Sequence, residues 1–573
     1  MSRASHTAGD ISLVFSGEAG QGLQTLEQLV TRLFKRAGYH VFSYSEVMSR
    51  IRGGNNTTRL RISSRRVACC LRRIDILVPL HAGAMARLRE GITPETVILG
   101  DPAFIDAAYR DGSQPVVEVP LAEMAREAGG DIYLNVLLAG LLSGLFCLDE
   151  ALLEDQIGEF FGKAGEDRVG RNLEAARKGY GRGSHVLKAG QVLPFPERSE
   201  EARRELLLTG VDAVGIGGLA GGCSFVSSYP MSPSTGLLLF YARHAQEFGL
   251  VVEQAEDEIS AINMALGAWY AGGKALVTTS GGGFSLMVEG LSLAGSIESP
   301  VVIHLGQRPG PATGLPTRTE QADLEHALYS GHGEFPRLIL APGTLKEGYD
   351  LARHAFFMAD RFQIPVFILT DQYFLEGLCT VGSLDIPSRE QESFIVETDA
   401  GYRRYRLTED GVSPRGIPGF GSGLVCVDSD EHDETGHITE DSRVRADMVD
   451  KRLRKIESVK QACIPPTLTG SEDFRHLVVG WGSTFAVVRE ALDVLKRTDL
   501  AFLHFSQVYP LHPAAAGIMK RAERRIILEN NATGQFGKLI RQQTGIGFEG
   551  RILKYDGFPF LLEEVVERLE VLL

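Results

Sequence analysis

Short apolar runs alternate with helical patterns along most of the chain, and each run ends in a glycine-rich or proline-containing turn. Runs that predict buried strands occur at 11–15, 76–79, 96–99, 249–253, 275–279, 301–305 and 366–370. Helical spacing of apolar residues follows from Leu23 onward and recurs at 255–270 and 345–359. Strands that alternate with helices in this way are typical of parallel βαβ units, so we predict an α/β fold.

The pattern divides the chain into four segments. We predict α/β domains with Rossmann-like parallel sheets at 1–193, 205–385 and 471–573, and an irregular connector at 386–470. Residues 194–204 are polar and proline-punctuated, which is typical of a linker. The carboxylate-rich stretch 428–441 contains two histidines, but its spacing favours a solvated, ordered connector that covers a neighbouring domain over a metal site.

Composition narrows the class of protein. The 573 residues carry a net charge of −14, which argues against nucleic acid as the main partner. The seven cysteines form no Cys-x-x-Cys pair, so neither an iron–sulfur cluster nor a zinc site is expected in this chain. The start of the chain lacks the features of a signal peptide, and the most apolar stretch, 132–148, is shorter than a membrane span and predicts a buried helix. We therefore expect a cytoplasmic protein with no membrane partner.

The first candidate site is the turn Ser16–Gly22, which follows the strand at 11–15 and precedes a helix. Gly17, Gly20 and Gly22 give a rearranged form of the dinucleotide-binding fingerprint. Backbone amides at such a turn suit a phosphate, because no Cβ obstructs the approach and the helix N-terminus is electropositive.

A cluster of basic residues lies near this turn in the sequence. Between residues 50 and 75 there are eight arginines and a single acidic residue, and the turn after Arg52 lies among them. An exposed strand face accounts for two or three of these arginines. The excess indicates a polyanionic ligand, and coenzyme A suits so small a patch better than nucleic acid does.

The second candidate site consists of four sequence blocks. Each stands where a strand is expected to end, and they cover 228–235, 253–261, 278–284 and 304–314. Together they indicate half of a thiamine diphosphate site. Tyr229 and Pro230 belong to the first block, and the glycines Gly281, Gly282 and Gly283 would let the backbone approach a flat ring, although a plain tight turn explains them equally. The Gly-Asp-Gly element that holds Mg²⁺ on the pyrophosphate is absent from the sequence. We therefore expect a partner chain to supply it, and no metal ligands here.

Thiamine activation requires a carboxyl group beside the pyrimidine ring. Glu258 stands at the expected start of a helix among small apolar residues, where burial would raise its proton affinity. Glu256 is the rival for this catalytic role. The alternative explanation is an acidic helix start that interacts favourably with the helix dipole.

Two further residues are candidates for substrate binding. Arg308 precedes Pro309-Gly310-Pro311, which fixes its backbone, and its guanidinium could bind a 2-oxoacid carboxylate. Ser232 stands between two prolines, and its hydroxyl could either donate to the substrate or cap the helix that begins near Ser234.

These motifs resemble the alpha subunit of the 2-oxoacid:ferredoxin oxidoreductases with the family's gamma domain fused at its N-terminus. The sequence from Tyr229 to Thr235 is similar to the family's Tyr-Pro-Ile-Thr-Pro-Ser-Ser, with Ser232 at the threonine that contacts substrate. By the same resemblance Arg308 binds the carboxylate, Glu258 or Glu256 activates thiamine, and the turn at 16–22 with Arg52 belongs to the coenzyme A-proximal gamma domain. Segments 481–484 and 530–535 resemble the transketolase C-terminal-type domain.

The resemblance implies a beta subunit that carries Mg²⁺ and a [4Fe–4S] cluster, in an (αβ)₂ assembly that reduces ferredoxin. The fused layout is most similar to that of enzymes that convert 2-oxoglutarate and coenzyme A into succinyl-CoA and CO₂ reversibly. Such enzymes need an extra cation for the distal carboxylate of the substrate, and Arg318 is the candidate for that role. Pyruvate, branched-chain and aryl 2-oxoacids remain alternatives, as does a non-catalytic coenzyme A-binding scaffold or a non-redox thiamine enzyme.

Overall fold

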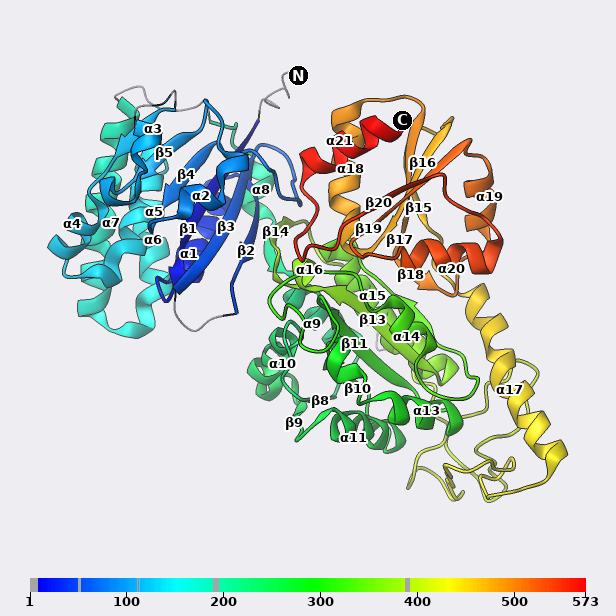
Figure 1. Ribbon diagram of the computed structural model, residues 1–573. Coiled ribbons are helices and arrows are strands. Elements are labelled where there is room, and N and C mark those ends of the chain that lie inside the picture. Colours follow the sequence, from blue (N-terminus) through cyan, green and yellow to red (C-terminus); the bar gives the residue numbers. More distant parts are fainter. Residues whose placement is uncertain (1–8, 50–52, 111, 113, 189–194, 387–391) are drawn as a thin grey trace. The chain divides into compact units, whose positions relative to one another are not determined.

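The computed structural model describes residues 9–49, 53–110, 112, 114–188, 195–386 and 392–573 (Figure 1). The chain divides into two compact units. The first comprises the residues up to Leu208 together with Glu376–Ser383 and Leu561–Glu564, and the second comprises the remainder. The predicted α/β class is confirmed, since the described residues form three mostly parallel sheets flanked by helices.

The first unit contains an eight-stranded sheet of order β6-β5-β4-β1-β3-β2-β14-β7. The strands are β1 (Asp10–Ala19), β2 (His40–Glu46), β3 (Gly53–Ser63), β4 (Ile76–Pro79), β5 (Val97–Gly100), β6 (Val116–Glu118), β7 (Leu206–Thr209) and β14 (Leu378–Val381). The sheet is mixed rather than parallel, because β3 pairs antiparallel with both β1 and β2. Strands β2 and β3 follow each other without a helix between them, so they can pair antiparallel through a short connection.

Helices cover both faces of this sheet. They are α1 (Leu23–Arg36), α2 (Ala84–Arg87), α3 (Ala107–Arg110), α4 (Leu121–Glu127), α5 (Leu134–Leu145), α6 (Glu150–Phe161), α7 (Glu166–Lys188) and α8 (Glu200–Arg204). The larger core packs α1, α5, α6 and α7 against one face, and a smaller core packs α2 against the other. The predicted buried helix at 132–148 is confirmed as α5.

Helices α5 and α7 pack in direct backbone contact through glycines. A Cβ atom at Gly140 would stand 2.0 Å from the carbonyl oxygen of Ala176, and one at Gly183 would stand 2.0 Å from that of Leu141. Any side chain at these positions would force the helices apart. Among the described residues, no single helix is long and apolar enough to cross a membrane, although α4 and the segment Asp131–Leu145 pass that test together as a pair bent by 112°.

The described part of the predicted linker, residues 195–204, is an ordered segment that contains helix α8. Ser199 caps α8, and the Ser199 amide donates to the Gly38 carbonyl at 2.6 Å. His40 and Glu205, immediately after the helix, form a buried pair at 3.1 Å. Side-chain and backbone partners therefore hold this segment against the first unit, which its polar composition alone did not reveal.

The second unit contains two sheets. The seven-stranded sheet has the order β18-β12-β13-β11-β10-β8-β9 and is parallel except at β18. Its strands are β8 (Phe225–Ser228), β9 (Val251–Gln254), β10 (Ala275–Thr279), β11 (Val301–Gln307), β12 (Leu338–Leu340), β13 (Pro365–Asp371) and β18 (Gln507–Tyr509). The five-stranded sheet, in the order β15-β17-β16-β19-β20, comprises β15 (Thr467–Gly470), β17 (Leu500–Phe505), β16 (His476–Trp481), β19 (Arg524–Glu529) and β20 (Gly550–Leu553).

The helices of this unit pack on both sheets to form one continuous core. Those around the seven-stranded sheet are α9 (Gly210–Ala220), α10 (Thr235–Phe248), α11 (Glu258–Tyr270), α12 (Gly281–Phe284), α13 (Val288–Ser296), α14 (Leu324–Tyr329), α15 (Leu345–Phe362) and α16 (Gln372–Glu376). The later helices are α17 (Ser442–Gln461), α18 (Phe485–Leu495), α19 (Ala514–Lys520), α20 (Gln535–Thr544) and α21 (Leu562–Leu572).

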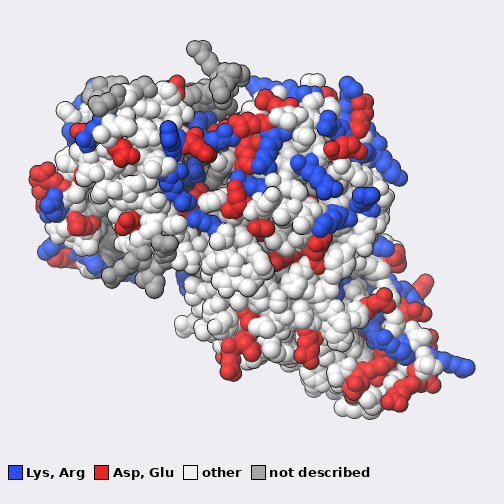
Figure 2. Space-filling view, in the orientation of Figure 1, with Lys and Arg blue, Asp and Glu red and all other residues white. Residues whose placement is uncertain are grey.

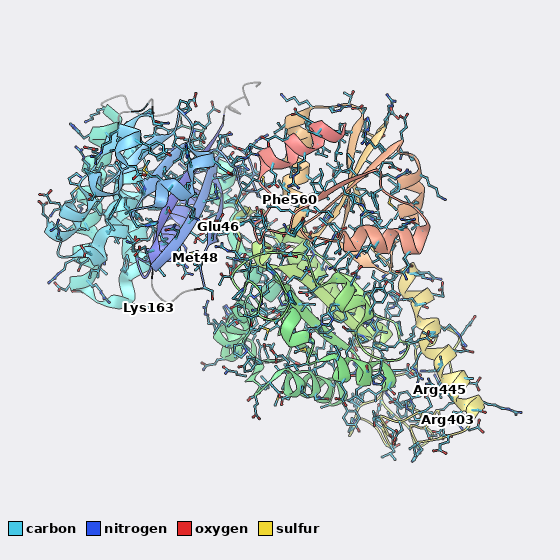
Figure 3. All side chains as sticks on the ribbon, viewed as in Figure 1. Glu46, Met48, Lys163, Arg403, Arg445 and Phe560 are labelled. Atoms are coloured by element: carbon cyan, nitrogen blue, oxygen red, sulfur yellow. The ribbon has the colours of Figure 1, made fainter. Side chains whose placement is uncertain are left out.

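The segment between β14 and α17 is irregular but makes specific contacts with the second unit. The Arg415 guanidinium binds Asp360 at 2.5 Å, and the Tyr270 hydroxyl donates to the Val425 carbonyl at 2.9 Å. Acidic and basic side chains mix on its surface (Figure 2), where Arg403 pairs with Glu434 and Arg445 pairs with Glu431 (Figure 3). The described part of the predicted connector is therefore a packed layer that covers its neighbour.

Candidate functional site

Two carboxyl groups flank the glycine turn Gly281–Gly283, where β10 ends and α12 begins. A Cβ atom at Gly283 would stand 2.3 Å from Oε1 of Glu258, and one at Gly281 would stand 2.4 Å from Oδ1 of Asp323. A Cβ at Gly281 would displace the Asp323 carboxyl, and one at Gly283 would displace the Glu258 carboxyl and the Thr279 hydroxyl. The first and third glycines therefore allow these carboxyl groups to lie against the backbone of the turn.

Glu258 is buried without a full set of hydrogen bonds. It is 2 % exposed, and its Oε1 has no hydrogen-bond partner among the described residues. Burial raises the pKa of this carboxyl most, the Glu258 backbone amide lowers it by less, and the neighbouring Asp257 raises it slightly. Glu258 is the first residue of α11, but the cap comes from Asp257, which accepts from the Ser260 amide at 2.8 Å. The competing Glu256 is exposed.

The structure brings Arg308 and Ser232 together. The Arg308 Nη1 donates to the Ser232 carbonyl oxygen at 2.7 Å. Arg308 Nε has no hydrogen-bond partner among the described residues, and burial lowers the pKa of its guanidinium while Asp323 raises it by less. The hydroxyl of Ser232 does not cap α10, because the N-cap position belongs to Ser234. Arg308 thus keeps donors available for an anion, beside an exposed serine.

The rest of the predicted ring-binding surface lies on neighbouring loops. Tyr229 is 41 % exposed and follows Ser228, whose hydroxyl donates to the Thr278 carbonyl at 2.6 Å. Pro230 is half-buried after it. Gly282 is exposed, and a Cβ there would meet only the Ala312 carbonyl oxygen, at 3.6 Å. Of the three glycines, Gly282 is the one whose backbone stays open to a ligand.

A buried histidine joins the strands beneath these loops. His304 of β11 bonds Thr278 at 2.7 Å through Nδ1 and Thr370 at 2.9 Å through Nε2. Burial lowers the pKa of His304 to about 3, so the imidazole is neutral at physiological pH. Its role is to tie β10, β11 and β13 together below the site.

The loop after Arg308 meets the five-stranded sheet. Arg318 is 8 % exposed, its guanidinium lies 4.6 Å from the Phe558 ring centre, and its Nη1 is buried with no partner among the described residues. Gln321 is fully buried, donates to the Trp481 carbonyl at 2.9 Å and accepts from the Asn530 amide at 3.0 Å. The two sequence motifs of the last domain therefore hold this loop in place.

In the first unit, the turn from Ser16 to Gly22 is fixed by neutral hydrogen bonds. Gln21 Oε1 accepts from the Glu18 amide at 2.8 Å, and Asn135 Nδ2 donates to the Gln21 carbonyl at 2.9 Å. Gly22, at φ +71°, caps α1 in the left-handed region that favours glycine, and Gly20 at φ +95° faces open space. A Cβ at Gly17 would meet Gln21 Oε1 at 2.6 Å.

Several neutral polar atoms near this turn are buried and lack partners among the described residues. They are Ser16 Oγ, Thr57 Oγ1, His81 Nε2 and Asn135 Oδ1. Ser16 stands opposite Thr57 in the register of β1 and β3, and the Ser16 carbonyl oxygen accepts from the amide of Leu80, the neighbour of His81, at 2.8 Å. Unsatisfied buried polar atoms are rare in proteins, and a group of them is typical of a site for a missing ligand.

The predicted arginine cluster is largely neutralised by folding. Arg59 pairs with Glu46, Arg61 and Arg73 with Asp10, and Arg66 with Glu201 and Glu205. The acidic partners come from outside the sequence window in which the arginines were counted. Arg52 and Arg50 lie outside the described residues.

Comparison with known proteins decides the family. Residues 216–451 match the family described as "Pyruvate flavodoxin/ferredoxin oxidoreductase, thiamine diP-bdg", and residues 12–182 match "Pyruvate ferredoxin/flavodoxin oxidoreductase". The chain is 32 % identical to the alpha subunit of 2-oxoacid:ferredoxin oxidoreductase 2 from Aeropyrum pernix, over 97 % of this chain and 96 % of that protein. This chain belongs to the 2-oxoacid:ferredoxin oxidoreductase alpha subunits.

Two further relatives extend the comparison. The chain is 31 % identical to the 2-oxoglutarate synthase subunit KorA of Archaeoglobus fulgidus, over 64 % of this chain and 98 % of that protein. The solved 2-oxoglutarate:ferredoxin oxidoreductase of Magnetococcus marinus, with 2-oxoglutarate, coenzyme A and succinyl-CoA bound, superimposes with a TM-score of 0.90 at 30 % identity, over 98 % of this chain and 99 % of that chain. The family predicted from the motifs is confirmed.

The residues of this family member fit thiamine diphosphate. A buried carboxyl with one unsatisfied oxygen and a raised pKa, as at Glu258, is the partner that a pyrimidine ring nitrogen requires. The neighbouring backbone at Gly282 is free of side-chain obstruction. This chain therefore presents a surface suited to the ring end of the cofactor.

Sequence reasoning missed Asp323. It stands fifteen positions after Arg308 in a polar stretch, and no spacing rule connects it to the glycine turn. The signal that reveals it is tertiary, since Gly281 lacks a side chain because the Asp323 carboxyl occupies that volume.

Proposed function

We propose that this chain is the alpha subunit of a 2-oxoglutarate:ferredoxin oxidoreductase. The complex would convert 2-oxoglutarate and coenzyme A into succinyl-CoA and CO₂, reversibly, with reduction of ferredoxin. The observation that carries this proposal is the bond from Arg308 Nη1 to the Ser232 carbonyl, because it joins the candidate carboxylate-binding arginine after β11 to the serine of the candidate substrate motif after β8.

Each residue has a distinct task. Arg308 would bind the 2-oxoacid carboxylate through its remaining donors, and the exposed hydroxyl of Ser232 would donate to a substrate oxygen. Glu258 would hold a proton at the pyrimidine ring, a role for which its raised pKa is suited. Thiamine diphosphate, when bound, supplies the nucleophilic carbon and the electron sink for decarboxylation. Tyr229, Pro230 and the Gly281–Gly283 backbone would line its ring.

A beta subunit would complete the site. The 573 residues contain no Gly-Asp-Gly element, so Mg²⁺ and the pyrophosphate need ligands from another chain, which would also carry the [4Fe–4S] cluster in an (αβ)₂ assembly. Apolar side chains are exposed beside Glu258 on α11, on the edge strand β9 and on α10. They are Ile259, Met264, Tyr270, Val251, Leu239 and Phe248. Exposed apolar side chains on these elements suit a protein partner.

Coenzyme A would bind at the turn of the first unit. Gly17, Gly20 and Gly22 form the turn before α1, and the buried unsatisfied atoms of Ser16, Thr57, His81 and Asn135 are suited to a polar ligand. The arginine pairs described above leave less positive charge there than the sequence suggests, so neutral hydrogen bonds and the start of α1 would do most of the binding. Arg52 stays a prediction.

The choice of 2-oxoglutarate rests on Arg318 and on the relatives. Arg318 has a buried guanidinium nitrogen without a partner among the described residues, which is the property expected of a cation reserved for a distal carboxylate. The solved Magnetococcus marinus enzyme, which superimposes with a TM-score of 0.90, has 2-oxoglutarate bound. The relatives called KorA are also named for 2-oxoglutarate.

The test is viologen reduction by the purified complex with coenzyme A and a panel of 2-oxoacids. We expect the highest kcat/KM with 2-oxoglutarate, and Arg318→Gln to shift the preference towards pyruvate by at least about tenfold, roughly the free energy of one charged hydrogen bond. Preference of the native complex for pyruvate, branched-chain or aryl 2-oxoacids would overturn the substrate assignment. Turnover without viologen reduction would indicate a non-redox thiamine enzyme.

A further inference from the structure

Asp323 is the second carboxyl group at the glycine turn, and the proposed function leaves it without a role. It occupies the N-cap position of α14, yet its side chain makes no capping hydrogen bond. Its amide donates to Gln307 Oε1 at 3.0 Å, which directs the carboxyl towards Gly281. Oδ2 is buried and has no hydrogen-bond partner among the described residues. An aspartate at an N-cap usually accepts from the helix amides, so this geometry shows a carboxyl diverted from its structural role.

The charged groups around Asp323 come from several elements. Arg308 follows β11 and interacts with Asp323 electrostatically, and Glu320 precedes Asp323 in the same loop. Glu258 lies across the turn on α11, and His326 lies one turn along α14, bonded to Ser285 at 3.2 Å. Asp556 in turn acts on Glu320.

These neighbours make Asp323 unusually easy to protonate. Burial raises the pKa of this carboxyl most, the Glu320 carboxylate raises it further, and Arg308 lowers it, with a result of about 7. The side chain can therefore exist in either form under working conditions. In the neutral form one of the two oxygens beside Gly281 becomes a hydrogen-bond donor.

We propose that Asp323 is a substrate-binding residue that contacts the 2-oxoacid in its neutral form and donates a hydrogen bond to a substrate oxygen next to Arg308. The inference rests on the proposed function. Its physical basis is that an ionised Asp323 and the substrate carboxylate would both be negative beside a single guanidinium. Substrate binding therefore takes up one proton at pH values at which free Asp323 is ionised.

The experiment compares the pH dependence of KM for the preferred 2-oxoacid in the native complex and in variants, between pH 6 and 9. For the native complex we expect KM to rise above about pH 7 by up to about tenfold per unit, because each unit costs about 1.4 kcal/mol of proton uptake. In Asp323→Asn, a neutral donor of the same shape, KM should stay flat and fall below the native value at pH 9. Calorimetry at pH 8 in two buffers should show proton uptake on substrate binding by the native complex and none by the variant.

Two further variants keep the result interpretable. Glu320→Gln removes the charge that raises the pKa of Asp323, so the rise in KM should keep its slope and begin at lower pH. Asp323→Ser is a second neutral donor for use if the asparagine variant is not folded. A native pH slope in both neutral variants would overturn the proposal, as would a large rise in their KM at every pH, which would mean that the ionised form binds substrate.

This outcome is separable from that of the proposed function. If the native complex oxidises a 2-oxoacid but the neutral variants retain its pH slope, only the role of Asp323 is lost. If the native complex oxidises no 2-oxoacid of the panel, both proposals fall together.

Discussion

Glu258 and Glu298 lie in the same unit and are buried to the same extent, 2 % exposed, yet their surroundings are opposite. Glu258 has an oxygen without a partner among the described residues, and burial raises its pKa. Glu298 accepts from Lys451 Nζ at 2.6 and 2.8 Å and pairs with Lys455 Nζ at 2.5 Å. Burial alone would raise the pKa of Glu298, but Lys455, Lys451 and Arg404 lower it far below its usual range.

The difference teaches how to separate function from structure among buried charges. The Glu298 carboxylate, which is surrounded by cations, holds helix α17 onto the rest of the second unit through Lys451. All of its hydrogen-bond partners come from the protein itself. A carboxyl left incomplete costs stability and is retained where a ligand completes it. Exposure and residue type are equal in the two cases, so partners alone distinguish them.

The largest expected effect is a loss of activity on substitution of Glu258, the carboxyl with an unsatisfied oxygen. Glu258→Gln should lower kcat of the complex by about 10³-fold or more, because it removes a proton held at the cofactor ring. Steady-state viologen reduction measures this. Glu256→Gln is the matched control, two residues away and exposed, and should retain nearly native activity. Equal losses in the two variants would contradict the assignment, and native activity in Glu258→Gln would support the non-catalytic scaffold.

The ion pairs of Glu298 predict an effect on stability rather than on activity. Lys451→Met should destabilise the connector by about 3 kcal/mol, because it removes a cation from a buried carboxylate. Hydrogen–deuterium exchange of the complex should show faster exchange in α17 and at 404–415, with little change at α11. Lys460→Met, which removes an exposed pair with Glu457 on the same helix, should leave exchange unaltered.

The pH dependence of stability should differ in sign between the two glutamates. The pKa of Glu258 is raised, so its cost to stability appears as pH rises above the unfolded value of about 4.3, and Glu258→Gln should gain thermal stability over the native chain between pH 4 and 7. The pKa of Glu298 is lowered, so its contribution is present above that value and is lost in acid. The deficit of Glu298→Gln should therefore shrink as pH falls. If the thermal unfolding midpoints of the two variants changed with pH in the same way, the contrast between Glu258 and Glu298 would be wrong.

The smallest expected effect extends the comparison to neutral groups. Ser16→Ala removes a buried hydroxyl without a partner among the described residues, so it should raise KM for coenzyme A by about fivefold, the free energy of one neutral hydrogen bond, at native stability. Ser45→Ala removes a hydroxyl bonded to Glu27 at 2.8 Å and should reduce stability while leaving that KM unchanged. The reverse pattern would place coenzyme A elsewhere.

Local patterns predicted the fold because the apolar runs and glycine turns are short-range signals. The strand at 76–79 is β4, and the helix predicted at 345–359 is α15, which extends to Phe362. The division of the chain into four segments stays a prediction, since contacts divide the chain into two units. Strand β14 belongs by sequence to the second predicted domain, yet it hydrogen-bonds to β2 of the first unit. A strand joins a sheet through its backbone, which sequence composition does not specify.

The arginines between residues 50 and 75 show the limit of counting charge along a chain. Asp10 binds both Arg61 and Arg73 from fifty or more positions away, and Glu205 binds Arg66 from a still greater separation. The window from 50 to 75 contains the cations but, of the acidic residues that pair with them here, only Asp75. The same limit hid Asp323, whose position at Gly281 depends on two loops that meet only in the folded chain.

By itself, the sequence determined which chemical groups stand at the ends of the strands: Glu258, Arg308, Ser232 and the glycine turns. Those groups follow from local periodicity, because a strand followed by a turn exposes its last residues at the edge of a parallel sheet. Only the tertiary structure decided which of them are left unsatisfied and which are neutralised. Hydrogen bonds and ion pairs join residues hundreds of positions apart, so the free donors and acceptors of a site are defined only after the whole chain has folded.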